Sequence, residues 1–279
     1  MPVVTTSDGV SIAVTDFGGS GPPLVLAHAT GFHSLVWRPL ARLLTDRFRC
    51  VALDFRGHGD SGPAPGADYH WSGFARDLLA VVDGLDLGRP FAVGHSCGGA
   101  SLLLAEQAAP RTFRALFLYE PIVMPVEPPP GPDPANHLAV LSRRRRRSFV
   151  SRDAAYDNFA SKAPLMAFVP DALAAYVDHG FAVQPDGAVT LKCPPEVEAA
   201  VFAHSSSHDA YSRLALVSCP VTLACGEETD SYGLPVMEAL HARLPRSTVA
   251  PLAGLGHFGP MSDPDRVAAA VAGAFRPEG

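Results

Sequence analysis

Short apolar runs alternate with segments of helical period along most of the chain. Residues 10–16 alternate apolar and polar side chains, as an edge strand does. The glycine-rich segment 17–23 that follows is interpreted as a turn and not as a nucleotide loop, because no helix begins after it. Six further apolar runs predict buried strands at residues 24–27, 50–53, 90–93, 115–119, 221–225 and 247–251.

Helical periodicity occupies the stretches between these runs. Residues 72–87 place their large apolar side chains on one face of a helix. Further helices are predicted at 100–109, 236–244 and 264–275, the last with a proline in its first turn. Strands that alternate with helices are typical of a mostly parallel, doubly wound sheet covered on both faces, so the predicted class is α/β.

Residues 121–216 break this alternation. They open with the proline-rich stretch 125–134, include helical pieces such as 171–179, and show no convincing core strand. An insertion of this size predicts a helical cap over a site, with residues 1–120 and 217–279 forming the core. The five arginines at 143–147 are interpreted as the solvated face of a cap helix and not as a polyanion site.

Composition narrows the class of protein. The 279 residues fit one large domain with an insertion, and the net charge of −6 leaves no basic footprint for nucleic acid. The five cysteines form no CxxC pair and are expected to be free thiols in a reducing cytoplasm. No signal sequence and no apolar stretch long enough to span a membrane is evident, so we expect a soluble cytoplasmic protein that acts on a small molecule, with a homodimer left open.

A pentapeptide of the G-x-S-x-G type occupies residues 94–98, with Ser96 at its centre. It follows an apolar strand and precedes a helical segment, which is the context of a nucleophile elbow. The tight turn requires glycine at its flanks, and it exposes the serine at the carboxyl end of the sheet. The backbone N–H of Cys97, at the start of the helix, can then hold the oxyanion of a tetrahedral intermediate.

Three motifs together resemble the α/β-hydrolase superfamily: GHSCGG at 94–99, DFRGHGDS at 54–61 and GHFGP at 256–260. They fall in the chain order of that superfamily, and the resemblance covers the whole chain except the cap. It implies an α/β-hydrolase fold and hydrolytic chemistry. It names no substrate, because this fold hosts many reactions.

The resemblance also assigns roles in the loop at 28–32. This loop is similar to the superfamily's oxyanion loop, usually His-Gly-X, so Thr30 supplies the second N–H, although Ala29 stands where glycine is usual. His28 is expected to be a structural hydrogen-bonding residue and not a base. Asp54 is expected to brace the turn at 56–59.

His257 stands where the superfamily places its general base, and its ordinary pKa near 6.5 suits proton transfer at neutral pH. His58 and His95 are expected to support loops. His204 and His208, at the end of the cap, are candidates for lining the pocket.

The carboxylate of the triad is expected after the strand at 221–225. Asp230 fits the family spacing G-E-X-[ST]-D, and Glu227 and Glu228 compete with it. Glu120 is a further alternative, because it ends the strand at 115–119, where some family members carry their acid. The proline after Glu120 favours an extended backbone there, which suggests a supporting or substrate-contacting group.

The sequence therefore predicts a serine hydrolase that cleaves an ester or related carbonyl bond through an acyl-enzyme, with Ser96, His257 and Asp230 as the triad. No cofactor is expected, and no metal, since no cluster has metal-ligand spacing. A C–C bond hydrolase or perhydrolase with the same triad, and a non-catalytic binding protein, are the alternatives; the haloalkane dehalogenase and epoxide hydrolase branches carry aspartate at the elbow. Aromatic and apolar cap residues suggest an apolar substrate: Phe149, Phe159, Met166, Phe168, Tyr176, Phe181 and Phe202.

Overall fold

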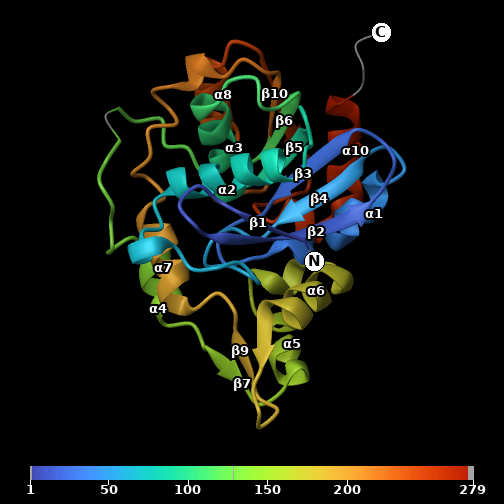
Figure 1. Cartoon of the computed structure of the whole chain (residues 1–279), viewed down its shortest axis with the longest axis vertical. Coiled ribbons are helices and arrows are strands. Elements are labelled where there is room, and N and C mark those ends of the chain that lie inside the picture. Colours follow the sequence, from blue (N-terminus) through green and yellow to red (C-terminus); the bar gives the residue numbers. More distant parts are fainter. Residues whose placement is uncertain (1, 128, 276–279) are drawn as a thin grey trace.

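An eight-stranded sheet forms the centre of the molecule in this computed structural model, which describes residues 2–127 and 129–275 (Figure 1). Pro128, inside the predicted proline-rich stretch, lies outside the described residues. The strand order is β1-β2-β4-β3-β5-β6-β10-β11, with β1 and β2 antiparallel to their neighbours and the others parallel. The mostly parallel sheet predicted from the sequence is confirmed. The strands are β1 (Val3–Thr5), β2 (Ser11–Gly18), β3 (Pro23–Ala27), β4 (Arg49–Leu53), β5 (Phe91–His95), β6 (Ala115–Tyr119), β10 (Val221–Gly226) and β11 (Ser247–Leu252).

The two edges of the sheet differ from the sequence-based prediction. The strand predicted as an edge, β2, pairs on both sides, because the short β1 lies outside it. The last strand, β11, was predicted to be buried, but it pairs only with β10 and its residues are partly or fully exposed. Pro251 in this run is a signal for an edge position, since proline has no N–H to donate to a neighbouring strand.

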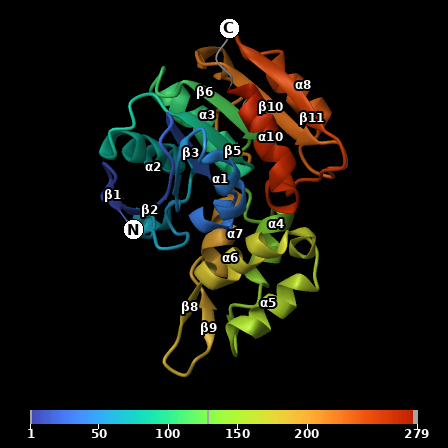
Figure 2. The same ribbon diagram turned by 90° about the vertical axis from the view of Figure 1, so that its right-hand side faces the viewer.

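Helices cover both faces of the sheet (Figure 2). Val267 and Val271 face the apolar cluster that contains α1, and Phe74 and Leu78 face the cluster on the other side. Burial of these apolar stripes is the main stabilisation that fixes helices on a sheet. One face carries α1 (Arg38–Leu44), α9 (Gly259–Ser262) and α10 (Pro264–Ala274), and the other α2 (Trp71–Gly84), α3 (Cys97–Ala108) and α8 (Leu234–His241).

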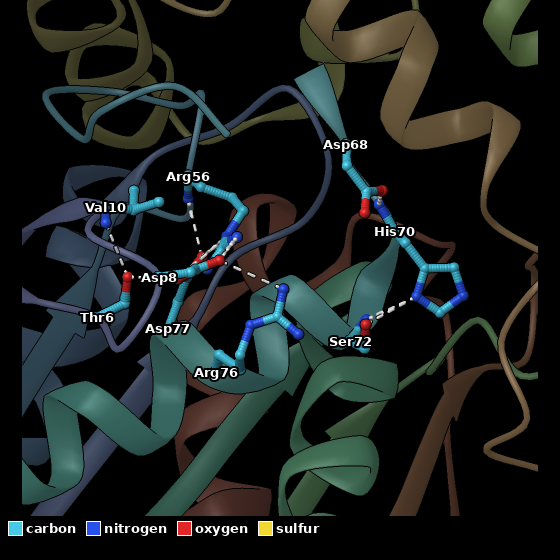
Figure 3. A network of polar contacts seen from close by, with 9 residues as sticks. All are labelled: Thr6, Asp8, Val10, Arg56, Asp68, His70, Ser72, Arg76 and Asp77. Atoms are coloured by element: carbon cyan, nitrogen blue, oxygen red, sulfur yellow. Dashed lines mark hydrogen bonds and ion pairs between the residues drawn. The ribbon is translucent and has the colours of Figure 1, made fainter. Parts of the chain in front are cut away.

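A buried ionic network fixes the loop that follows β4 (Figure 3). The guanidinium of Arg56, 1% exposed, donates to Asp77 of α2 at 2.7 Å and to Asp8 at 2.7 Å. Burial disfavours the charge of Arg56, but these two carboxylates outweigh it and raise its pKa. Asp54 in turn accepts the N–H of Asp60 at 2.8 Å, as expected for a residue that braces this turn.

Residues 121–216 are here called the cap segment, and its helices and short strands lie below the sheet in the view of Figure 1. A small antiparallel sheet accompanies the helices of this segment. The sequence did not predict it, because strands of two or three residues show no measurable period. The elements are α4 (His137–Arg143), β7 (Ser148–Phe149), α5 (Arg152–Ala160), α6 (Pro170–Gly180), β8 (Phe181–Val183), β9 (Val189–Leu191) and α7 (Pro195–Ala203).

Polar contacts attach the cap segment to the core. Asp171 of α6 accepts from Arg38 of α1 at 2.6 Å, and Lys192 donates to Asp60 at 2.6 Å. The indole of Trp71 donates to the carbonyl of Val201 at 2.9 Å. These contacts hold α6 against the start of α1, Lys192 against the loop after β4, and α7 against the start of α2.

All five cysteines are free and buried, as expected: Cys50, Cys97, Cys193, Cys219 and Cys225. Within the part of the chain that the structure describes, no helix combines the length and apolar character needed to cross a bilayer.

Candidate active site

Ser96 stands on a strained turn between β5 and α3. Its backbone has φ 56° and ψ −116°, a region that L-residues rarely adopt and that is typical of functional turns. A Cβ added to Gly94 would lie 2.7 Å from the backbone of Gly99, and one on Gly98 would lie 2.2 Å from the carbonyl oxygen of Ala27. The glycines flanking Ser96 therefore let the strand and the helix approach closely enough to form the predicted elbow.

The two residues predicted to supply the oxyanion donors, Thr30 and Cys97, have their side chains close together. Cys97 begins α3, whose first N–H groups receive no side-chain cap. Thr30, in the loop after β3, lines the same cavity as Ser96. Burial raises the pKa of the Cys97 thiol to about 12. A hydrogen bond with the side chain of Thr30 acts to lower this pKa, so the two side chains are in contact. The loop after β3 and the start of α3 are therefore in contact beside Ser96.

His28 fixes the loop that carries Thr30. Its Nδ1 donates to the carbonyl of Ala29 at 2.7 Å, and its Nε2 accepts the N–H of Phe55 at 3.0 Å. Burial lowers its pKa well below the ordinary value, which keeps the ring neutral. The prediction of a structural role for His28 is confirmed.

Glu120, and not Asp230, provides the carboxylate that contacts His257. The Nδ1 of His257 donates to Oε2 of Glu120 at 2.6 Å, and the Glu120 side chain is fully buried. The same carboxylate accepts the N–H of Gly226 at 3.0 Å and the hydroxyl of Thr229 at 2.8 Å. Three donors hold the carboxylate in place, and it in turn fixes the proton of His257 on Nδ1.

The expected contact between Asp230 and His257 is not found in the described residues. Asp230 is exposed and lines the cavity, while the preceding Thr229 binds Glu120. The loop after β10 therefore supports the carboxylate with a hydroxyl and does not supply it.

The proline after Glu120 predicts an extended backbone at Glu120, but the structure shows a different conformation. Glu120 has φ +44°, and its N–H donates to the carbonyl of Ala224 in β10 at 2.8 Å. A left-handed conformation costs about 1–2 kcal/mol for a residue with a Cβ, so the surrounding hydrogen bonds must hold it.

His95 supports the loop of His257. Its Nε2 donates to the His257 carbonyl at 2.8 Å, and burial lowers the pKa of His95 well below the ordinary value. The neutral ring therefore acts as a hydrogen-bond donor behind the site, in agreement with the predicted supporting role.

The remaining candidates lie away from the cavity surface. His208 is buried, stacks on Trp71 and donates to the carbonyl of Ile122 at 3.0 Å. His204 contacts Ser207. Glu227 and Glu228 are exposed. Among the described residues none of these four side chains lines the cavity, so the expectation of pocket roles for His204 and His208 is wrong.

A cavity of about 750 Å³ contains Ser96 and His257 and lies between the core and the cap segment. Within residues 2–127 and 129–275 no hydrogen bond joins these two side chains; such catalytic contacts commonly tighten only when substrate binds. Phe32 meets Phe258 and Tyr176 edge-on in the wall, with ring centroids 6.0 and 5.4 Å apart. The apolar lining includes Phe32, Trp71, Ile122, Leu138, Leu141, Phe159, Leu165, Phe202, Tyr232 and Phe258.

The cap aromatics singled out in the sequence divide into two groups. Phe159, Tyr176 and Phe202 line the cavity. The other rings, those of Phe149, Phe168 and Phe181, are buried within the molecule. The side chain of Met166 is exposed. The core also supplies aromatic residues to the lining: Phe32, Trp71, Tyr232 and Phe258. Of these, Phe32 and Phe258 could have been found from their places beside Thr30 and His257.

The arginine run is not wholly a solvated face. The helix α4 ends at Arg143, and Arg145 turns inward to line the cavity, with 23% of its side chain exposed. It is ion-paired with Glu198 of α7 and donates to the hydroxyl of Tyr176 at 2.6 Å. A run of identical residues gives no period, so the sequence could not show which arginine faces inward.

Comparison with known proteins agrees with this architecture. Residues 24–270 match the model of the Alpha/beta hydrolase family, and the chain belongs to that family. It is 29% identical over 278 residues to haloalkane dehalogenase 2 of Mycobacterium tuberculosis, covering 92% of this chain and 89% of that protein.

Two solved structures share the fold. The E-2-(acetamidomethylene)succinate hydrolase has a TM-score of 0.79 at 23% identity, covering 98% of this chain and 97% of that one. An esterase from Thermogutta terrifontis has a TM-score of 0.73 at 23% identity, with 98% and 96% covered. Similarity at this level establishes the common fold alone.

Proposed function

We propose that the protein is a serine hydrolase that cleaves an ester or related carbonyl bond, with Ser96, His257 and Glu120 as its triad. The observation that carries the proposal is the buried hydrogen bond from His257 Nδ1 to Glu120, with His257 and Ser96 in one cavity. A proton fixed on Nδ1 leaves Nε2 free to accept the proton of Ser96. Asp230, the acid expected from loop spacing, is left without this role.

The reaction follows from this arrangement. His257 removes the proton of Ser96 as its oxygen attacks the carbonyl carbon, and the N–H groups of Cys97 and Thr30 stabilise the oxyanion. The imidazolium, stabilised by Glu120, then protonates the leaving group to give the acyl-enzyme. Water, activated by the same imidazole, releases the acid.

Serine at the elbow bears on the similarity to haloalkane dehalogenase 2. That branch carries aspartate at this position, and a serine hydroxyl activated by a base favours acyl transfer instead. The volume of the cavity is suited to a small-molecule substrate, and its many aromatic side chains favour an apolar acyl or aryl group. Since cap residues form much of the wall, we assign substrate selection to the cap segment.

A fluorophosphonate probe and a panel of p-nitrophenyl esters of graded chain length, with lactones and vinylogous diketones, test the proposal. We expect labelling of the wild type, loss of labelling in Ser96→Ala, and turnover of short or aryl esters. Turnover near wild type in Ser96→Ala would overturn the mechanism. Labelling with turnover of diketones alone would indicate a C–C hydrolase, and an unlabelled wild type a binding protein.

A further inference from the structure

An ion pair of the cap segment rests directly on the loop that carries Thr30. The guanidinium of Arg145 is paired with the carboxylate of Glu198, which is 8% exposed, and with the hydroxyl of Tyr176. Both charged residues line the cavity that contains Ser96. The triad mechanism uses neither of them.

The contact with the loop is made at Gly31. A Cβ added to Gly31 would lie 2.8 Å from Oε1 of Glu198 and 3.4 Å from Nη1 of Arg145. The carboxylate therefore lies against the Cα of Gly31, one residue after Thr30. Gly31 also has φ +80°, so glycine is favoured here for its backbone as well as for this close approach.

Charge makes this contact consequential. A carboxylate beside an oxyanion loop opposes the negative charge that develops in the transition state, and it does so strongly where water is excluded. Arg145 neutralises the charge of Glu198. Because Arg145 also donates a hydrogen bond to the hydroxyl of Tyr176, its guanidinium is fixed and holds the Glu198 carboxylate in place. A paired carboxylate can thus support the loop without repelling the oxyanion.

We propose that Glu198 and Arg145 are positioning residues for the oxyanion loop at 28–32, through which the cap segment acts on catalysis as well as on substrate selection. Glu198 supports Gly31 and so the N–H of Thr30, and Arg145 holds and neutralises Glu198. This inference rests on the proposed serine-hydrolase function.

Four variants test it. Glu198→Ala removes the contact with Gly31, and Arg145→Met leaves the carboxylate unpaired. Each should lower kcat for p-nitrophenyl butyrate, and the rate of fluorophosphonate labelling, by about 10- to 100-fold, a loosened donor costing less than a deleted one. Glu198→Gln keeps the contact with Gly31 and leaves only the positive charge of Arg145, which does not oppose the oxyanion, whereas the double variant Arg145→Met/Glu198→Gln removes both charges. Both should stay within about fivefold of wild type, on the same reasoning.

A second ion pair, between the same arginine run at 143–147 and the same helix α7, provides a matched control. Arg147 and Glu196 form an ion pair at 2.5 Å with side chains 50% and 65% exposed. Arg147→Met and Glu196→Ala should leave kcat and labelling unchanged, because that pair is solvated. Loss of activity in these controls equal to that in Glu198→Ala would overturn the inference and indicate a general effect on the cap.

The other outcomes are equally decisive. A KM that rises at constant kcat, only for esters that carry a carboxylate, would make Arg145 a substrate anchor and overturn the positioning role. Labelling at the wild-type rate in Glu198→Ala would do the same. If Arg145→Met does not fold, Glu198→Ala against Glu198→Gln decides alone. An unlabelled wild type contradicts the proposed function, whereas a labelled wild type with unchanged variants contradicts only this inference.

Discussion

The Nδ1 of His257 and the Oε2 of Glu120 lie 2.6 Å apart, although 137 residues separate them in the chain. Glu120 follows β6 and His257 follows β11, on either side of β10 in the sheet. The end of β10 and the loop after it lie between them and contribute Gly226 and Thr229 to the same carboxylate. The acid is therefore held by three segments at once.

Glu120→Gln should lower kcat by up to about 10⁴-fold, because an amide facing Nδ1 favours the wrong tautomer of His257. Asp230→Asn should change kcat by less than about tenfold, as expected for a side chain that does not touch the imidazole. Steady-state kinetics on the best p-nitrophenyl ester measure both. The reverse order of effects would return the role to Asp230.

Gly98→Ala should destabilise the fold by about 1–3 kcal/mol, as overpacking commonly does. The new methyl group would meet the carbonyl oxygen of Ala27 at 2.2 Å, and backbone on both sides leaves little room to adjust. Gly273→Ala is the control: nothing lies within 4 Å of its added Cβ, and it stands in α10, so a small gain in stability is expected. Urea unfolding compares the two. Equal stability of the variants would show that the elbow does not need this close approach.

Arg56→Met should lower the free energy of unfolding by about 3–5 kcal/mol, because it leaves Asp77, fully buried, without its partner. Adding Asp77→Leu should recover part of the loss. Arg76→Met removes an exposed contact to Asp8 at 3.3 Å and should cost less than about 1 kcal/mol. A loss for Arg56→Met no larger than that for Arg76→Met would contradict a structural role of the buried pair.

Stability should fall as the pH decreases from about 6.5 to about 4. Burial lowers the pKa of His208, His33 and His58 to about 4, below the ordinary 6.5. In this window the unfolded chain binds protons that the folded chain does not, so acid favours unfolding. Well above pH 6.5 all three histidines are neutral in both states, and their contribution to stability is constant.

His208→Gln keeps a donor for the carbonyl of Ile122 and should reduce the slope of unfolding free energy against pH by up to about 1.4 kcal/mol per pH unit between pH 4 and 6.5. Urea unfolding at several pH values gives this slope, with His241→Gln, at an exposed histidine, as the control. An unchanged slope in His208→Gln would mean that His208 protonates equally in both states.

The sequence by itself determined most strands and helices of the core, β1, α1 and α9 excepted, and the candidate residues whose assignment depends on their immediate neighbours. Ser96 lies in a strand-turn-helix context that local pattern shows, whereas His257 and Thr30 were selected by their places after particular strands and by the resemblance to the α/β-hydrolase superfamily. The order of the sheet edges was not determined, because a short apolar run looks alike at an edge and in the middle.

Only the tertiary structure decided the contacts between distant segments. Glu120 reaches His257 because its backbone takes a positive φ that bonds to β10 stabilise, against the extended form that Pro121 favours. Arg145 faces the cavity because Glu198 and Tyr176, far along the chain, supply its partners. Spacing within one loop made Asp230 the natural candidate, but a hydrogen bond depends on distance in space, and packing of three segments places Glu120 there.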